Sequence, residues 1–194
     1  MCLNVLSLRK HFKEVKRDVV RNKRFSVLCL QETWLLANDD GHDYQLENFN
    51  CDFNSRGFGK GIATYYTEIF KIKDRVCSDD CQFSVLTSRQ LNVVNVYRSR
   101  GCKNLCQLLK PRVDLNIPSI ICGDFNLNYQ DGENDVSRFL KQTMNLRQLV
   151  NQPTHDKGSI LDQVWISEQL IDRVTMKQTC VRYSDHDLIK IMIK

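Results

Sequence analysis

The amino-acid sequence predicts an α/β sandwich with mixed β-sheets. About nine or ten short segments have the apolar or alternating pattern of strands, and two or three stretches have apolar residues at helical spacing. Most of the strands follow one another in hairpins instead of alternating with helices, which disfavours a doubly wound parallel sheet. With 194 residues, of which 42% are hydrophobic, the chain fits a single domain over residues 1–194 with a substantial core.

The first thirty residues predict a strand, a helix and a second strand. Residues 2–6 form a short apolar segment in which Asn4 is the only polar residue, and residues 25–30 form a buried strand that runs directly into Glu32. Between them lies an amphipathic helix with an apolar face toward a sheet and a basic outer face. The apolar positions of that helix are Leu8, Phe12, Val15 and Val19.

The middle of the chain predicts a polar surface loop and a set of hairpins. Residues 39–60 are rich in Gly, Asn and Asp, and we expect only a short strand there, near residues 44–49. A short helix over residues 104–109 is limited by Pro111. Successive strands are expected over residues 61–72, 83–87 and 91–97.

The second half of the chain is organised around the apolar run at residues 117–122. This run predicts a core strand, and Gly123 suits a sharp exit of the backbone at its end. Asp124 and Asn126 follow at once, and two residues of such spacing on an extended segment point the same way. A helix over residues 136–144 is expected next. Further extended segments are expected over residues 146–150, 160–166, 174–181 and 188–193.

Charge and cysteine content restrict the environment of the protein. The net charge is +5, and residues 1–24 carry eight Lys or Arg against two acidic residues, so this segment can attract a polyanion or be a solvated helix face. Nine cysteines cannot all pair, and several lie in apolar runs, as expected in a reducing, intracellular compartment. The pairs Cys77/Cys81 and Cys102/Cys106 leave a zinc site as an alternative. No apolar stretch approaches the length of a membrane span, so no membrane partner is expected.

Polar residues interrupt or follow the apolar strands at several places in the chain. In a mixed sheet such strand ends gather at one rim, where carboxylate and amide oxygens suit Mg²⁺ and a histidine beside a carboxylate suits a developing oxyanion. The combination predicts metal-assisted cleavage of a phosphodiester, although Asp and Asn also favour ordinary turns. The residues concerned are Asn4, Glu32, Tyr97, Asp124, Asn126, Asp162, Ser184, Asp185 and His186.

In this order along the chain, these motifs resemble the exonuclease, endonuclease and phosphatase superfamily. The segments at residues 3–8, 28–35 and 152–155 are most similar to the endonuclease domains of LINE-type and related retroelements. The resemblance implies a four-layer α/β sandwich with two packed mixed β-sheets flanked by helices. It also implies an enzyme that uses Mg²⁺, with Mn²⁺ as a substitute, to nick DNA and leave a 3′-hydroxyl that primes reverse transcription.

The resemblance assigns a role to each candidate residue. Glu32 would be the main metal ligand, helped by Asp185 and Asn4. Asp124 would activate or position the attacking water with Asn126, and Asp162 would orient His186 toward the phosphate oxygen. Tyr97 would act in catalysis by contacting the phosphate, Thr154 would contact the DNA backbone or the metal network, and Ser184 would support the rim. The four residues predicted to bind the substrate are Thr154, Ser184, Arg98 and Arg100.

Two departures from the family pattern sharpen the expectation. Leu6 stands where the DNA-repair members usually carry an acid, which disfavours repair-type cleavage at abasic sites. Arg98 and Arg100 follow Tyr97 where the family often has a proline and an asparagine, so we expect the arginines to replace a phosphate contact.

We expect a monomer acting in the nucleus on chromosomal DNA. Because the chain ends with its last strand, we also expect a domain of a longer polyprotein with a reverse transcriptase, a truncated gene product or a domesticated remnant. Two alternatives remain open: hydrolysis of a phosphorylated lipid or small molecule, and nucleic-acid binding without catalysis.

Overall fold

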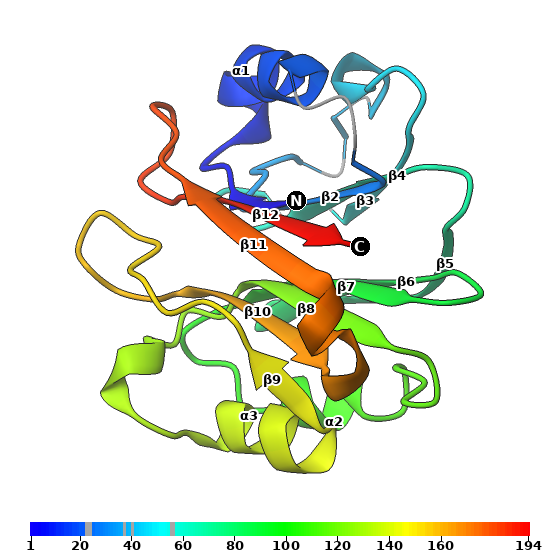
Figure 1. Cartoon of the computed structure of the whole chain (residues 1–194). Helices are drawn as coiled ribbons and strands as arrows, with labels where there is room; N and C mark the ends of the chain where they lie inside the picture. Colours follow the sequence, from blue (N-terminus) through cyan, green and yellow to red (C-terminus); the bar gives the residue numbers. More distant parts are fainter. Residues whose placement is uncertain (22–24, 37, 40, 55–56) are drawn as a thin grey trace.

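The computed structural model contains two six-stranded sheets packed face to face (Figure 1). It describes residues 1–21, 25–36, 38–39, 41–54 and 57–194. The side chain of Val19 lies outside this description, so its predicted place on the apolar helix face stays a prediction. The first sheet has the order β11-β12-β1-β2-β4-β3 and the second the order β5-β6-β7-β8-β10-β9.

The first sheet joins the two ends of the chain. Strand β1 runs parallel to β2 and antiparallel to β12, which brings the amino-terminal and carboxy-terminal segments together. The strands of this sheet are β1 (Cys2–Asn4), β2 (Val27–Gln31), β3 (Asn50–Asn54), β4 (Ile62–Tyr66), β11 (Val174–Thr179) and β12 (Leu188–Ile193).

The second sheet is formed from the middle of the chain. Strands β7 and β8 are parallel, and β10 pairs antiparallel with β8. The strands of this sheet are β5 (Lys71–Cys77), β6 (Cys81–Thr87), β7 (Asn92–Arg98), β8 (Ser119–Asp124), β9 (Leu146–Gln148) and β10 (Asp162–Ser167).

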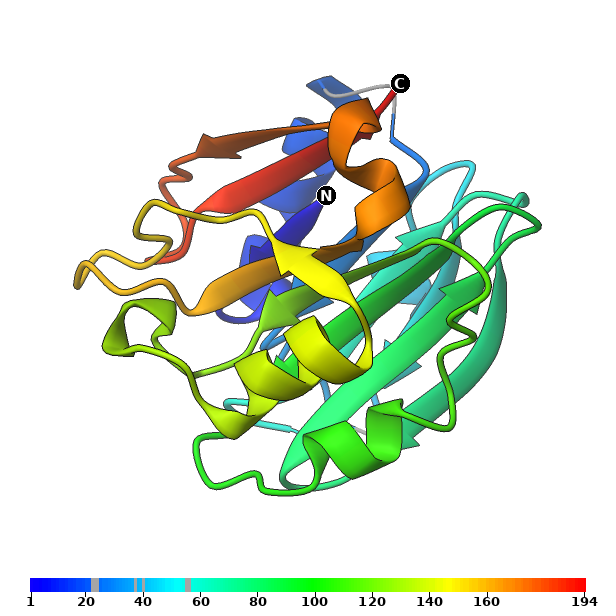
Figure 2. The ribbon, with the colours of Figure 1, turned by 60° about the horizontal axis from the view of Figure 1, so that its bottom comes forward.

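Helices cover both outer faces, so the molecule has four layers (Figures 1 and 2). Helix α1 (Leu8–Arg21) lies on the first sheet, where Leu8 and Val15 are buried. Its exposed basic side chains among the described residues are those of Arg9, Lys10, Lys13, Lys16 and Arg17. Helix α2 (Leu105–Leu109) and helix α3 (Asp135–Arg138), which continues as a π-helical turn over Phe139–Thr143, lie on the second sheet. The four-layer sandwich expected from the sequence is therefore confirmed. Short 3-10 turns occur at Gly41–Tyr44, Tyr129–Asp131 and Glu168–Arg173.

Two predicted strands and the alternative of a zinc site differ from the structure. The strand expected near residues 44–49 is preceded by a 3-10 turn, and extended structure begins only at Asn50. The strand expected over residues 61–72 is two strands, because a turn closed by the Phe70 N–H on the Thr67 carbonyl separates β4 from β5. The zinc alternative finds no support: among the described residues no group of three metal-ligating side chains includes a cysteine. Cys77 and Cys81 instead flank the hairpin between β5 and β6.

Polar side chains make part of the contact between the two sheets. The Gln31 amide donates to the Asn95 side chain at 2.6 Å, and Asn95 donates in turn to Thr64 at 2.9 Å, so buried hydrogen bonds join strands of both sheets. Ser84 also donates to the buried Asp52 across the sheets at 2.6 Å. Because buried amides are costly to leave unpaired, this network fixes how the two sheets face each other.

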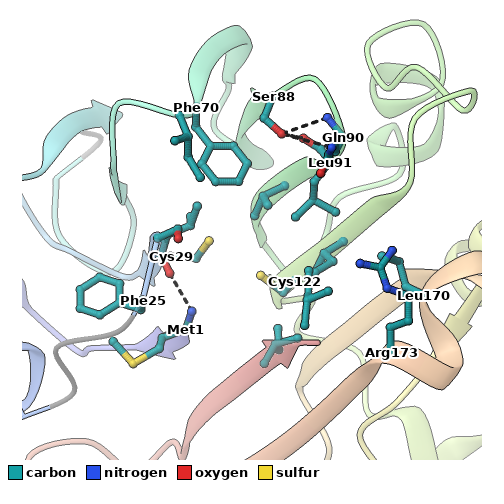
Figure 3. A pocket seen from close by; sticks show the side chains of 17 residues that line it. Met1, Phe25, Cys29, Phe70, Ser88, Gln90, Leu91, Cys122, Leu170 and Arg173 are labelled. Atoms are coloured by element: carbon teal, nitrogen blue, oxygen red, sulfur yellow. Dashed lines mark hydrogen bonds between the residues drawn. The ribbon is translucent and has the colours of Figure 1, made fainter.

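The two rims of the sandwich differ in character. At the rim where β1, β2 and β8 begin, a cavity of about 330 Å³ is lined mainly by apolar side chains, including Phe25, Phe70 and Leu170 (Figure 3). The thiols of Cys29 and Cys122 also line it. The candidate site residues lie at the opposite ends of the same strands.

Candidate active site

Strand pairing brings the predicted residues to one rim. Because β1 is parallel to β2 and Asn4 pairs with Gln31, Glu32 follows directly beside Asn4. In the second sheet Asp124 pairs with Tyr97 on one side and with Asp162 on the other. The rim therefore collects residues from β1, β2, β7, β8 and β10, which are far apart in the sequence.

The strand β8 reaches the rim through a close contact that only glycine allows. We expected the strand to stop at Gly123, but it continues through Asp124. Gly123 has φ = +149°, and a Cβ atom at this position would lie 1.8 Å from the Val96 carbonyl oxygen of β7. Any larger residue would push β8 away from β7 and displace Asp124, so the glycine serves strand packing and not a turn.

Asp124 is buried and held by three donors. Its Oδ1 accepts the Asn126 backbone N–H at 2.8 Å, and its Oδ2 accepts the side-chain amides of Asn4 at 2.9 Å and Asn126 at 3.2 Å. Burial and the nearby charge of Asp162 raise the pKa of Asp124 to about 7, while His186 and the Asn126 N–H act in the opposite direction. The carboxylate is thus fixed in orientation, with a pKa suited to accepting a proton near neutral pH.

His186 is oriented by Asp162 in the same buried region. Its Nδ1 lies 2.7 Å from Asp162 Oδ2, and both side chains are buried. Burial lowers the pKa of His186, but the charge of Asp162 and its hydrogen bond outweigh burial and raise the pKa to about 9. The imidazole is therefore mainly protonated at neutral pH. The other Asp162 oxygen, Oδ1, is buried without a hydrogen-bond partner.

Glu32 lies in a strained turn at the end of β2. Its φ is +50°, and its backbone carbonyl accepts the Ser7 N–H at 2.8 Å, which holds the turn against the start of α1. The indole N–H of Trp34 donates to Glu32 Oε2 at 3.2 Å. Left-handed backbone at non-glycine residues costs about 1–3 kcal/mol and concentrates at functional sites. Asn126, which also has a positive φ of 48°, shows the same feature.

Asp185 lies next to two histidines, and the sequence predicted a role in the site for only one of them, His186. His155 Nε2 lies 3.4 Å from Asp185 Oδ2, and His186 Nε2 lies 3.7 Å from Asp185 Oδ1. The rings of His155 and His186 meet edge to face with centroids 4.7 Å apart. His155 was part of the recognised segment at residues 152–155, but its role depends on a bridge to His186 that sequence spacing does not encode.

The tautomer of His155 follows from its backbone contact. Its Nδ1 accepts the Lys157 N–H at 3.0 Å, so in the neutral ring the proton is on Nε2, which faces Asp185. In this arrangement the N–H edge of the neutral His155 ring faces Asp185. This favours a positioning role for His155 over metal ligation, although the three side chains are close enough to share an ion.

Tyr97 is buried at the penultimate position of β7. Its hydroxyl donates to the Gly59 carbonyl at 2.9 Å. Burial, and then the charges of Glu32 and Asp124, raise the pKa of Tyr97, so the phenol stays protonated and remains a donor at neutral pH. The exposed Arg100 lies close enough to Tyr97 to oppose this shift.

Three of the residues that were predicted to bind the substrate make hydrogen bonds within the protein. The Arg98 guanidinium is buried and donates to the carbonyls of Phe125 at 3.2 Å and Cys102 at 2.6 Å, so it shapes the loop after β8 instead of facing solvent. Thr154 is buried, and its hydroxyl accepts the backbone N–H groups of Leu161 and Asp162. Both side chains therefore support the site in this structure, and direct contact with the substrate stays a prediction for each of them.

Ser184 also makes its hydrogen bonds inside the protein, as its predicted role in supporting the rim implies. Its hydroxyl donates to the Asn4 carbonyl at 2.7 Å and accepts the His186 N–H at 3.1 Å. Ser184 thus ties the histidine to β1 and supports the rim. Of the four predicted substrate contacts, Arg100 alone keeps an exposed side chain.

The donor set at the rim fits a hard divalent cation. Glu32 is half-buried with a carboxylate that receives one donor among the described side chains, and Asp185 Oδ1 is buried without a hydrogen-bond partner. The side-chain oxygen of Asn4 accepts only the Leu6 N–H, at 3.3 Å, among the described groups and has a further lone pair. Carboxylate and amide oxygens of this kind are the ligands that Mg²⁺ prefers.

Comparison with known proteins agrees with this geometry. A family model described as the Endonuclease/Exonuclease/phosphatase family matches residues 1–186. Among curated protein sequences, none matches the chain.

Solved structures with this fold include several nucleases. An AP endonuclease from Archaeoglobus fulgidus has a TM-score of 0.76 at 18% identity, with 99% of this chain and 97% of that chain covered. The endonuclease domain of TRAS1, a telomere-specific non-LTR retrotransposon, has a TM-score of 0.73 at 14% identity, covering 100% of this chain and 96% of that chain. The 3′ phosphatase NExo from Neisseria, bound to a product DNA hairpin, has a TM-score of 0.71 at 14% identity, covering 100% and 98%. At these identities the structures show a shared fold, and together with the match over residues 1–186 they lead to one conclusion: the chain belongs to the endonuclease/exonuclease/phosphatase family.

Proposed function

We propose that the protein is a Mg²⁺-dependent DNA endonuclease that nicks one strand and leaves a 3′-hydroxyl, as in target-primed retrotransposition. The observation that carries this proposal is the meeting, at one rim, of the buried Asp124 with its amide donors and the Asp162–His186 pair. This arrangement supplies a fixed proton acceptor and a positively charged donor within one site.

The chain's own residues divide the chemistry of phosphodiester hydrolysis. Asp124, oriented by Asn126 and Asn4, holds the attacking water and accepts its proton. His186, kept protonated and oriented by Asp162, donates to the phosphate oxygen on which negative charge develops. Tyr97 donates to a neighbouring phosphate oxygen when the DNA displaces its bond to Gly59.

Glu32, Asp185 and Asn4 are the residues that would hold Mg²⁺, or Mn²⁺ in its place. When bound, the cation would polarise the phosphate and neutralise charge on the leaving oxygen. The turn at Glu32 and the contact of His155 with Asp185 keep both carboxylates at the rim in the absence of substrate.

DNA is the substrate that the surface favours. Helix α1 presents exposed basic residues, among them Arg9, Lys10, Lys13 and Lys16, and such a surface attracts a polyanion. TRAS1 is a retrotransposon endonuclease, and the NExo structure contains DNA, which supports the same substrate class here. As part of a retroelement the domain would act as a monomer in the nucleus and cooperate with a reverse transcriptase. In the described residues no helix is long and apolar enough to cross a membrane.

A second candidate function is removal of a terminal phosphate. It is favoured by the likeness to NExo, which is described as a 3′ phosphatase and has the same fold. The chemistry would use the same residues, with a phosphomonoester in place of the phosphodiester. Release of inorganic phosphate from a 3′-phosphorylated oligonucleotide, without nicking of plasmid, would favour this candidate.

Nicking of supercoiled plasmid tests the proposal. The protein should convert supercoiled to open-circular DNA with Mg²⁺ and not with EDTA, and a DNA polymerase should extend the nicks directly because they carry a 3′-hydroxyl. Glu32→Gln, which keeps the size and removes the charge, should abolish the reaction. Nicks that need a phosphatase before extension, or equal activity in Glu32→Gln, would contradict the proposal.

A further inference from the structure

Beside the site, an aromatic ring is left in solvent. The side chain of Phe58 is 81% exposed, although burying it would be favourable by about 1.5–3 kcal/mol. The ring does not stand alone, because it packs on Trp34 with centroids 4.2 Å apart and planes inclined by 37°. We call these two side chains the aromatic pair.

The aromatic pair is held by backbone hydrogen bonds between two segments. Residues 33–35 follow β2, and residues 57–61 form the loop before β4. The Trp34 N–H donates to the Lys60 carbonyl at 2.9 Å, and the Gly57 N–H donates to the Leu35 carbonyl at 2.9 Å. At Gly61, where φ is +95°, a Cβ atom would lie 2.4 Å from the Thr33 hydroxyl, so the close approach of the two segments requires glycine.

Both segments are joined directly to residues of the candidate site. The indole N–H of Trp34 donates to Glu32, a candidate metal ligand, at 3.2 Å. On the other side, the Tyr97 hydroxyl donates to the carbonyl of Gly59, the residue that follows Phe58. The exposed ring is therefore fixed next to the place where the phosphate is expected, and it can act on the same substrate.

We propose that Phe58, supported by Trp34, stacks on a nucleobase that has left the base stack next to the phosphate being cut. This rests on the proposed function as a DNA endonuclease. Aromatic side chains bind bases through their flat faces without regard to sequence. In an intact duplex those faces are covered by neighbouring bases, so the aromatic pair favours DNA with an unpaired or displaced base at the cut.

A phospholipid surface is the competing occupant for an exposed ring. Proteins that bind in the plane of a membrane usually do so with a long amphipathic helix or a lipid anchor. Here the ring is on a loop that is bonded to Glu32 through Trp34 and to Tyr97 through Gly59, so its position is set by the site. These contacts favour the base, and vesicle binding is included in the test.

The test compares two duplexes that differ at one nucleotide. Both contain the fluorescent base 2-aminopurine, either paired or in a one-nucleotide bulge, and binding is measured in EDTA so that no cleavage occurs. The wild-type protein should quench the bulged base and bind the bulged duplex more tightly than the paired one. Phe58→Ala should weaken binding to the bulged duplex about tenfold, as expected for loss of one stacked base, and change the paired duplex less than about twofold.

Two further variants separate stacking from general effects. Phe58→Tyr keeps the aromatic face and should retain the preference for the bulge. Ile69→Ala removes another exposed apolar side chain, 62% exposed and lining the cavity at the opposite rim, and should behave as wild type. Equal affinities of Phe58→Ala and wild type for the bulged duplex would overturn the proposal, as would an equal loss on both duplexes.

Two parallel measurements complete the experiment. If Phe58→Ala loses binding to vesicles of phosphatidylserine and phosphatidylcholine while its DNA binding is unchanged, the ring belongs to a membrane contact and the proposal is wrong. Nicking by Glu32→Gln is measured in the same preparations. Retained nicking in that variant would contradict the proposed site, whereas lost nicking with an unchanged Phe58→Ala would contradict the stacking inference alone.

Discussion

The two rims of the sandwich are formed by opposite ends of the same strands, yet they differ in almost every physical respect. At one end of β8, Asp124 is a buried carboxylate facing a second buried carboxylate, Asp162. At the other end Ile120 lines an apolar cavity beside Leu170 (Figure 3). Burial and the charge of Asp162 raise the cost of ionising Asp124. The fold thus concentrates unfavourable electrostatics at a single rim.

Strained backbone is concentrated at the rim that holds the candidate site. Among the described non-glycine residues with positive φ, five follow strands that reach the site, namely Leu6, Ser7, Glu32, Trp34 and Asn126, whereas Asn48 and Asn145 precede β3 and β9. Each such residue costs about 1–3 kcal/mol and persists only where the surroundings hold it. A mutation at the site should therefore affect function more than stability, and a mutation at the cavity should do the reverse.

The largest effect is expected for the buried acid at the site. Asp124→Asn keeps the size and most hydrogen bonds but cannot accept a proton, so nicking should fall by about 10²–10⁴-fold. Because a charge that is costly to bury is removed, the melting temperature should stay equal or rise. Plasmid nicking and thermal unfolding measured on the same sample check both parts, and a large loss of stability would show that Asp124 is needed for folding.

A smaller loss is expected when the histidine is changed. His186→Ala removes the charged donor and leaves Asp162 buried without a partner, so activity should fall by about 10²–10³-fold and stability should also fall. The double change of Asp162→Asn with His186→Ala should recover part of the stability but none of the activity. Thermal melts and single-turnover nicking distinguish these results. Full activity in His186→Ala would remove the histidine from the chemistry.

The opposite rim provides the matched control. Leu170 is 3% exposed and lines the cavity, so Leu170→Ala should destabilise the protein by about 2–5 kcal/mol. The fraction that remains folded should nick DNA at the wild-type rate. Urea unfolding gives the first quantity, and activity below the unfolding transition gives the second. A rate lowered more than about threefold would show that the two rims are coupled.

His155 should have the smallest effect of the site residues. His155→Ala removes the imidazole N–H that faces Asp185 without removing a metal ligand, so the Mg²⁺ concentration for half-maximal activity should rise about 10-fold while the maximal rate changes little. His155→Gln, which keeps a donor, should recover most of the affinity. A changed maximal rate at saturating Mg²⁺ would instead place His155 in direct contact with the substrate.

Much of the fold could be predicted because burial leaves a clear pattern in single segments. The apolar runs of β2 and β8 and the spacing of Leu8 and Val15 in α1 each indicate a buried face. Strand β5 could not be predicted in the same way, since its side chains alternate between exposed and half-buried at the edge of the sheet. The pairing of Gln31 with Asn95 depends on two strands meeting across the sheets, which neither segment encodes.

For the candidate site, the sequence predicted which residues lie together but not which partners they bind. The motifs around Asp124 and His186 predicted residues that do lie together at one rim. The motifs did not predict which polar side chains face inward: Arg98 and Thr154 bind backbone groups of neighbouring loops, and His155 gains its contact only because its segment bridges to His186. Sequence identifies the kind of chemistry at a strand end, whereas the hydrogen-bond partners come from the loops that cover it.

Binding of a divalent cation is the most direct test of the proposed metal site at the rim. Titration of the metal-free protein with Mn²⁺, followed by electron paramagnetic resonance and calorimetry, does not depend on any substrate. Saturable binding is expected in the wild-type protein and in Leu170→Ala at temperatures where that variant is folded. In Glu32→Gln the affinity should fall by at least about 10-fold. Equal Mn²⁺ affinity in wild type and Glu32→Gln would contradict the proposed metal site.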